Sequence, residues 1–480
     1  MGSSSKFSSI LQLTDLDDFI TPSQECIKPV LVEKGKSGAS GLAKIQIGDN
    51  VEINEQGRIT KLTKANISLS DCLACSGCIT SAESLLIGQQ NHAEFLKLFE
   101  EVASKEGERA IEKVIVTLSY QAVLSFAVKF RITPIEARAK LSGFFRHLGA
   151  SHVFDVESVS DLSLIECGKE FVQRVKKKSI SAVSTPILAS ACPGFVCYAE
   201  KTHGDWILPY VSEIKSPQQI AGALIKDTLS AEMGIAITRL AVVMVMPCFD
   251  KKLEASRSDF VCEDKQTKEV DMVITPIEIE QLLEQVKVDF VDLEASHVDS
   301  LNGASEQEWL IPAGSGSGGY AEHVLRYAAK ELYGIHLENI VFKPVKNSDM
   351  REASLVLQSG EPPVLTVAIA NGFRNIQNLV QRIKRKKCTY DYVEVMACPS
   401  GCLNGGAQLR PESDGDVKIL TSEMETLHTT LVQCHANESV VQKLSDKWAS
   451  AGVDTETWRR RLRAQYHAVP KSTNVLSVKW

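Results

Sequence analysis

The stretch Leu240-Ala241-Val242-Val243-Met244-Val245-Met246, followed at once by Pro247-Cys248, is the most informative part of this chain. An apolar run of this length is typical of a strand that is covered by helices on both faces of a parallel sheet. Cys248 follows where such a strand would end. Because open parallel sheets bind ligands beyond the carboxyl ends of their strands, we expect Cys248 to belong to a functional site.

Two further apolar runs end in the same way. The strand-like segment 187–190 leads into Ala191-Cys192-Pro193-Gly194, and the segment 392–396 leads into Cys398-Pro399-Ser400-Gly401-Cys402. An iron–sulfur cluster needs soft thiolate ligands, usually four. The four thiolates of such a site would come from Cys192, Cys248, Cys398 and Cys402. We therefore expect the fold to bring these three loops together.

The remaining pattern predicts the fold class. Strands are expected at 114–118, 153–155, 272–275 and 365–370, and helices at 134–148, 217–229, 277–285 and 321–332. Two such series, one from Lys113 and one from Leu240, predict an α/β fold with two facing lobes of mainly parallel sheet and flanking helices. We also expect a small N-terminal iron–sulfur segment before them. The expected domains are 1–108, 109–412 and, as a C-terminal helical region and tail, 413–480.

Composition and charge exclude several classes of protein. With 480 residues, 44% hydrophobic and 24% charged, the chain is expected to be an ordinary globular protein of two or three domains. A net charge of −7 argues against nucleic-acid binding, and no apolar run is long enough for a membrane span. No secretory signal is visible, and Lys6 departs from the N-myristoylation pattern at Gly2. We expect a cytoplasmic or nuclear protein whose 13 cysteines stay reduced.

A second cysteine motif lies near the N-terminus. Cys72, Cys75 and Cys78 are separated by two steps of C-x2-C, the spacing with which one tight loop ligates three irons of a cubane. A structural zinc site, which usually has two well-separated pairs, is the alternative, as is no metal at all. The local motif lacks a fourth ligand, and Cys26 is the nearest candidate upstream.

Two other features adjoin the expected site. Lys251 and Lys252 follow Cys248 and would balance the negative charge of a thiolate-bound cluster, unless they are exposed lysines at a helix start. The loop 314–319 fits G-x-G-x-x-G, but Pro312 interrupts the strand that a dinucleotide fingerprint requires. We expect this loop to form a wall of the metal site.

Together these motifs resemble the iron-only hydrogenase superfamily over about residues 113–410. The resemblance includes Ser216-Pro217-Gln218-Gln219, the block 270–275, the loop before Ala321 and Ala370-Asn371-Gly372. The sequence departs from this resemblance at Ala191, where hydrogenases have a cysteine that relays protons. Because alanine has no titratable group, the departure implies that this proton relay is broken. A single C-x2-C-x2-C also stands in place of the hydrogenases' long series of N-terminal clusters.

With these departures, and with its segments 11–26 and 465–469, the chain resembles the hydrogenase-like component of the cytosolic iron–sulfur protein assembly machinery. This component forms the nuclear prelamin A recognition factor-like family. This resemblance implies two [4Fe–4S] clusters and no hydrogenase activity. It assigns one cluster to Cys26, Cys72, Cys75 and Cys78, and the other to Cys192, Cys248, Cys398 and Cys402. It also implies a link between early cluster scaffold proteins and a late targeting complex that includes a WD40-repeat protein.

Two alternatives and one further feature complete the sequence-based picture. The alternatives are a degenerate hydrogenase-type redox enzyme and a nuclear module that binds a lamin-type tail, with clusters that only stabilise the fold. Trp480 resembles the aromatic tail with which clients dock on the targeting complex. Lys479 departs from that pattern, in which an acidic or small residue precedes the aromatic one.

Overall fold

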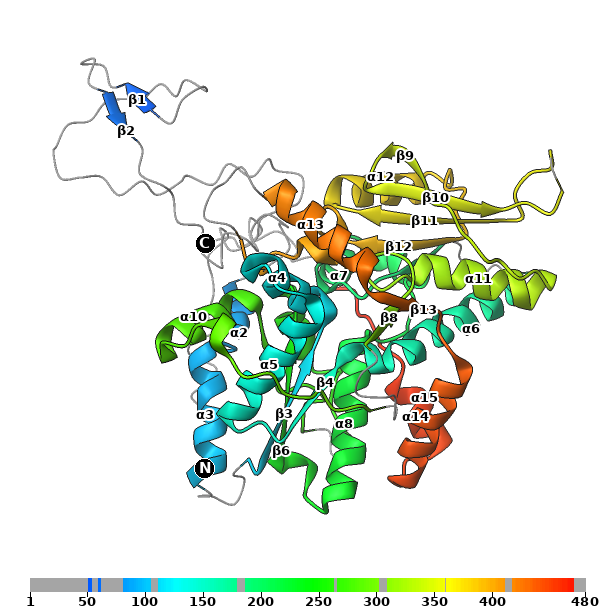
Figure 1. Cartoon of the computed structure of the whole chain (residues 1–480). Helices are drawn as coiled ribbons and strands as arrows, with labels where there is room; N and C mark the ends of the chain where they lie inside the picture. Colours follow the sequence, from blue (N-terminus) through cyan, green and yellow to red (C-terminus); the bar gives the residue numbers. More distant parts are fainter. Residues whose placement is uncertain are drawn as a thin grey trace, which may run out of the picture.

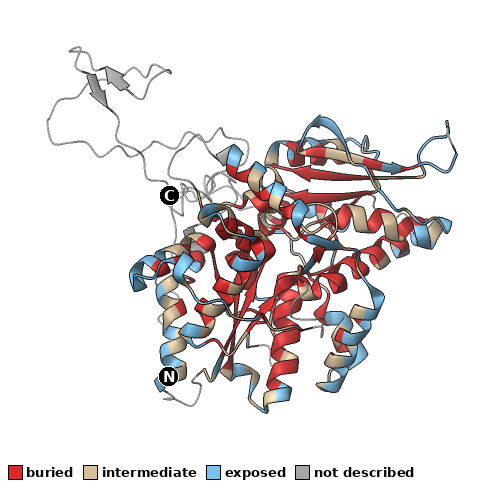
Figure 2. Cartoon of the chain, viewed as in Figure 1, coloured by how far each residue is buried: buried red, intermediate tan, exposed pale blue. Residues whose placement is uncertain are grey.

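The computed structural model describes residues 51–53, 59–61, 81–104, 111–178, 186–262, 266–301, 309–358, 360–410 and 417–469. Two sheets, each covered by helices, form its centre (Figure 1). The central strands of both sheets and the inner faces of the helices are buried, whereas the outer helix faces and the edge strand β9 (Lys343–Asn347) are exposed (Figure 2). The structure thus confirms an α/β fold with two lobes.

The first lobe contains a four-stranded, fully parallel sheet of order β4-β3-β6-β7. Its strands are β3 (Lys113–Leu118), β4 (His152–Asp155), β6 (Leu240–Val245) and β7 (Met272–Ile274). On β3, Val116 and Leu118 pack into one hydrophobic core and Ile115 packs into another on the opposite face. Both faces are buried, which explains the unbroken apolar runs.

Helices on either side cover this first sheet. One face carries α3 (His92–Ser104), α4 (Tyr120–Phe130), α5 (Pro134–Leu148) and α10 (Pro276–Val286), and the other carries α8 (Pro217–Met233) and α14 (Glu438–Ser450). Local signals set the ends of α5: the Thr133 hydroxyl accepts a hydrogen bond from Glu136 N, and Gly149 ends the helix with φ +110°.

The second lobe contains a five-stranded mixed sheet of order β5-β12-β11-β10-β9. Its strands are β5 (Ile187–Ala189), β9 (Lys343–Asn347), β10 (Met350–Leu355), β11 (Leu365–Asn371) and β12 (Tyr392–Met396). The first three in the order are parallel, and β10 and β9 extend the sheet antiparallel. The helices α6 (Ser160–Lys178), α7 (Pro193–Ile207), α11 (Tyr320–Tyr333) and α12 (Phe373–Lys384) flank this sheet.

The lobes do not follow the two series predicted from the sequence. The predicted first series includes β5, but β5 pairs with β12 in the second sheet. The predicted second series starts with β6, but β6 pairs with β3 in the first sheet. The chain therefore crosses between the lobes more than once, and the carboxyl ends of strands from both sheets point into the space between them.

Smaller elements complete the fold. They are β1 (Val51–Ile53) and β2 (Ile59–Lys61), an antiparallel pair, then α2 (Ser81–Gly88), α9 (Asp250–Ala255), β8 (Leu310–Pro312), α13 (Val417–Thr430), β13 (Val432–Cys434) and α15 (Thr455–Arg461). The 3-10 turns are η2 (Val156–Val159), η3 (Leu208–Tyr210), η4 (Ile237–Arg239), η5 (Phe290–Asp292) and η6 (Gly401–Asn404). Among the described helices, none has the length and apolar character needed to cross a membrane.

Elements after residue 413 pack directly on the two-lobed centre. Trp448 of α14 is fully buried against the α8 side of the first sheet, and its indole N–H donates to Asp227 at 3.0 Å. Met424 of α13 is buried in the core on the α4 side. The boundary at 412/413 stays a prediction, since these helices share their cores with the preceding residues.

Candidate functional site

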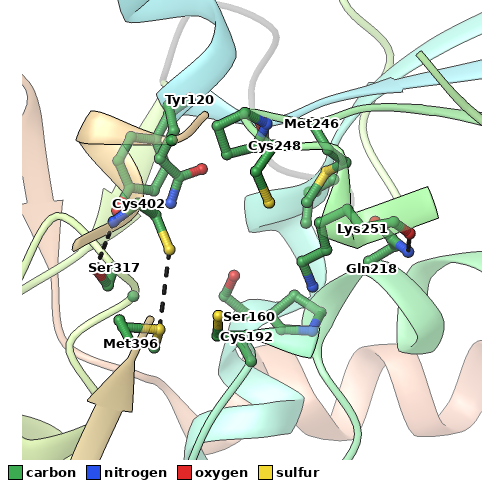
Figure 3. A pocket seen from close by; sticks show the side chains of 18 of the residues that line it. Tyr120, Ser160, Cys192, Gln218, Met246, Cys248, Lys251, Ser317, Met396 and Cys402 are labelled. Atoms are coloured by element: carbon green, nitrogen blue, oxygen red, sulfur yellow. Dashed lines mark hydrogen bonds between the residues drawn. The ribbon is translucent and has the colours of Figure 1, made fainter. Parts of the chain in front are cut away.

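The three cysteine loops predicted to meet do meet. Cys192, Cys248, Cys398 and Cys402 all line one cavity of about 70 Å³ between the lobes. Figure 3 shows the thiols of Cys192, Cys248 and Cys402 directed into the same space. Each loop directly follows a strand, namely β5, β6 or β12. The cavity therefore lies at the carboxyl ends of parallel strands from both sheets.

Cys192 lies at the start of helix α7. It is the N-cap residue, and Pro193 occupies the first helical position, where the missing N–H costs nothing. Its own N–H donates to Ser190 Oγ at 3.1 Å, and its sulfur accepts the Ala397 N–H at 3.4 Å. The Ala397 contact joins the Cys192 loop to the Cys398 loop. A helix N-terminus and an amide donor both favour a thiolate at this position.

Residues that are far away in sequence hold the turn 398–402 through hydrogen bonds. The Cys402 N–H donates to Ser317 Oγ at 3.0 Å, and the Ser400 N–H donates to Asp349 Oδ1 at 2.6 Å. The Cys402 sulfur lies 3.9 Å from the Met396 sulfur. Ser317 belongs to the glycine-rich loop, which is thus a wall of the site as expected. The sequence carries no local signal that would have identified the contact with Asp349.

Glycines let the three loops approach closely. A Cβ at Gly405 would lie 2.3 Å from the Pro247 carbonyl oxygen, and a Cβ at Gly194 would lie 2.7 Å from an Asp250 carboxylate oxygen. A Cβ at Gly401 would lie 2.3 Å from Ser317 Oγ. The described contacts of these glycines are with neighbouring loops. Their lack of a side chain is therefore what lets the four cysteines surround one cavity.

The two lysines after Cys248 have different surroundings. Lys251 lines the cavity, and its ammonium group donates to Glu254 at 2.6 Å and to Ser216 at 3.2 Å. Lys252 is fully buried and pairs with Glu278 at 2.5 Å, away from the cavity lining. The alternative that both are exposed is wrong. Only Lys251 is placed to balance charge at the site, because it alone of the two lines the cavity.

Burial raises the pKa of three of the cysteines that line the cavity, which favours their protonated form. It raises the pKa of Cys192 to about 12, with further contributions from Asp250 and Cys402. Burial also raises the pKa of Cys248 well above its usual range, as Asp250 and the neighbouring cysteines do to a smaller extent. Burial raises the pKa of Cys402, and this rise is opposed by the Ser317 hydrogen bond and by Lys251. Binding a metal here must therefore release protons.

The donor set fits an iron–sulfur cluster better than a single ion. Within the described residues, no three histidine, cysteine or acidic side chains are grouped so that they could hold one metal ion. In a cubane each thiolate binds a different iron, so the ligands surround a volume instead of meeting at a point. Four soft thiol donors around one cavity match that arrangement.

The predicted ligands of the second cluster and the predicted docking residue Trp480 cannot be compared with the structure. Cys26, Cys72, Cys75, Cys78 and Trp480 lie outside the described residues, and their functions stay predictions. The described cysteines form no disulfide with one another. Outside the site, Cys167 and Cys262 are buried and Cys197, Cys388 and Cys434 are partly buried.

Fold and site together define a protein of the iron-only hydrogenase type. The family model described as "Iron only hydrogenase large subunit, C-terminal domain" matches residues 112–406. The structure is similar to that of the [FeFe]-hydrogenase HydA1 from Chlamydomonas reinhardtii, with a TM-score of 0.66 and 25% sequence identity. The similarity covers 79% of this chain and 99% of that one.

Relatives along the whole length identify the family more closely. A protein from Xenopus tropicalis named cytosolic Fe-S cluster assembly factor narfl is 48% identical over 482 residues, which is 99% of this chain and 100% of the relative. A Mus musculus protein named cytosolic iron-sulfur assembly component 3 is 48% identical over 484 residues, with the same coverage. The chain therefore belongs to the family of hydrogenase-like cytosolic iron–sulfur cluster assembly factors.

Proposed function

We propose that this protein is a cytosolic iron–sulfur assembly factor that binds two [4Fe–4S] clusters and serves both cytosolic and nuclear client proteins. The observation that carries the proposal is that four cysteines of three separate loops line one cavity. The full-length relatives, whose names describe cytosolic assembly factors, support it. Cys192, Cys248, Cys398 and Cys402 would hold one cluster, and Cys26, Cys72, Cys75 and Cys78 would hold the other.

A bound cluster would supply redox-active and exchangeable iron and sulfide. The chain's own residues prepare its place. Ala397 N–H donates to the Cys192 sulfur, and Lys251 places positive charge at a cavity that would hold a net negative group. The walls are mostly apolar and include Met246 and Met396, so they would limit the contact of that group with water.

The proposed place in the assembly sequence is between early scaffold proteins and a late targeting complex with a WD40-repeat protein. The family resemblance supports this link. Co-purification of the full chain with that complex, compared between wild type and Cys402→Ala, tests it. Loss of the complex from the variant would support a cluster-dependent link, and unchanged recovery would favour a module that binds its partner without a cluster.

Hydrogenase chemistry is the competing function, because the fold is that of iron-only hydrogenases. Ala191 lines the cavity where a titratable side chain would be needed to relay protons. We therefore propose that the protein does not turn over hydrogen. A hydrogen-evolution assay on anaerobically reconstituted protein tests this, and hydrogen production above that of a Cys402→Ala control would contradict it.

The central experiment counts iron and acid-labile sulfide in anaerobically purified protein and records electron paramagnetic resonance. The proposal expects eight irons and eight sulfides per chain, from the two proposed cubanes. Cys398→Ala and Cys72→Ala should each remove the iron of one cluster and leave the spectrum of the other. A wild-type protein with only one cluster, or a Cys398→Ala variant with unchanged iron, would refute the two-site assignment.

A further inference from the structure

A second cavity lies directly behind the cluster site. It measures about 30 Å³, and it shares Ala191, Cys192 and Pro193 with the first cavity. One turn of chain thus forms the wall between the two. Its other walls include residues of α7 and α9 and the side chain of Tyr466. The second cavity therefore extends from a proposed cluster ligand toward the C-terminal end of the described chain.

Tyr466 belongs to a surface segment, residues 464–469, which we call the strap. Within it, Gln465, His467 and Ala468 are exposed, whereas Tyr466 is partly buried. Tyr466 lines both the second cavity and an outer groove of about 480 Å³ that contains Arg459 and Arg460. Burial raises the pKa of the Tyr466 hydroxyl, in accord with an inward position. Tyr466 is thus the residue that the second cavity and the outer groove have in common among the described residues.

Polar contacts hold the strap to Glu200 of α7, to Glu213 and to the turn that contains Arg257 and Asp259. The His467 N–H donates to Glu200 Oε1 at 3.0 Å, and the Val469 N–H donates to the Glu200 carbonyl oxygen at 3.1 Å. Arg257 pairs with both carboxylate oxygens of Glu200 at 2.8 and 2.9 Å, and its guanidinium carbon lies 5.7 Å from the centre of the Tyr466 ring. The Glu200–Arg257 pair is therefore the anchor under the strap.

Displacing the strap would disrupt less of the fold than displacing the other walls of the second cavity. Those walls include α7 and α9, which are packed into the hydrophobic cores, and loop residues such as Lys215 and Phe260, which are themselves buried. Lifting residues 464–469 would break the bonds to Glu200, the bond from Ala464 N–H to the Glu213 carbonyl oxygen and the bond from Arg257 to the Gln465 carbonyl oxygen. It would also withdraw the side chains of Ala464 and Tyr466. Segments with few buried contacts are the ones that open locally without global unfolding.

We propose that the second cavity is an access route to the Cys192 side of the cluster site and that Tyr466 is its gate. When the strap lifts, small molecules such as iron, sulfide or a chelator reach the ligand through this cavity. The biological meaning of the route rests on the proposed function, in which a cluster must enter the site and, if it is transferred, leave it.

The first experiment uses apoprotein, so that its result does not depend on cluster binding. Full-length wild type, Tyr466→Ala and the control variant His467→Ala are treated with iodoacetamide, and mass spectrometry follows the alkylation rate of each cysteine. Cys167 is the internal reference, because it is 2% exposed and lines neither cavity. We expect Tyr466→Ala to speed alkylation of Cys192 about tenfold or more. His467→Ala should have no such effect, and Cys167 should label at the wild-type rate in all three proteins.

Two results would overturn the proposal that Tyr466 is a gate. One is an unchanged Cys192 rate in Tyr466→Ala, and the other is a parallel rise at Cys167, which would mean general loosening of the lobe. Tyr466→Phe provides a further check, since it keeps the ring and should label like wild type. In anaerobically loaded protein, Tyr466→Ala should also lose iron to a chelator faster. If the protein held no cluster at all, the proposed function would fail while the alkylation result would still stand.

Discussion

Replacing Gly401 by alanine tests how the structure assembles its cluster site. Gly401 has φ +76°, a conformation that costs an alanine about 1–2 kcal/mol. The new Cβ would lie 2.3 Å from Ser317 Oγ, which accepts the Cys402 N–H. Displacing Ser317 would leave that amide without its partner, at a further cost of about 1–3 kcal/mol. The expected loss of unfolding free energy is therefore about 2–5 kcal/mol.

Gly334 offers a matched control. It has φ +68° at the end of α11, and a Cβ there would meet nothing within 4 Å. Gly334→Ala thus carries the backbone cost alone, and the difference between the two variants isolates the contact with Ser317. One kcal/mol shifts the thermal midpoint of a lobe of 150–250 residues by roughly 2–4 °C.

Scanning calorimetry of the two apoproteins, with iron analysis of the loaded proteins, measures both consequences. We expect Gly401→Ala to melt several degrees below Gly334→Ala and to lose the cluster of the cavity, while Gly334→Ala keeps it. Equal midpoints and equal iron contents would refute the reasoning, because they would show that the glycine-rich loop does not position Cys402.

Three further predictions concern stability and the clusters. Burial lowers the pKa of His323 to about 3, so below pH 6.5 the unfolded chain binds a proton that the folded chain does not. The free energy of unfolding should therefore fall by up to about 1.4 kcal/mol per pH unit toward pH 3. Urea titrations at several pH values should find this slope reduced in His323→Gln. Lys252→Met leaves Glu278 buried without its ion pair and should cost about 3–5 kcal/mol, measured by urea unfolding, whereas a cost below that of an ordinary surface substitution would contradict the pairing. In air, we expect the N-terminal cluster to decay first, because three of its predicted ligands lie in one short loop and the fourth is distant in sequence; spectra of Cys72→Ala and Cys398→Ala followed over time compare the two sites, and equal decay would disprove the difference.

Local sequence patterns determined the elements and the chemistry of this protein. The apolar run 240–246 predicts a strand with both faces buried, and β6 has that environment. Helix α5 spans the predicted residues 134–148, because its start and stop signals lie within a few residues of its ends. The placement of Cys192, Cys248 and Cys398 after strands also follows from the chain itself, since burial and hydrogen-bonding preferences act over short distances.

Only the tertiary structure decided which strands share a sheet and which side chains face the cavity. β5 pairs with β12, about 200 residues further along the chain, and no local pattern encodes such a partner. Lys251 and Lys252 are adjacent and chemically identical, yet only Lys251 lines the cavity, because the packing of α9 directs them differently. The position of Tyr466 behind Cys192 depends in the same way on contacts between distant segments, which form only when the whole chain has folded.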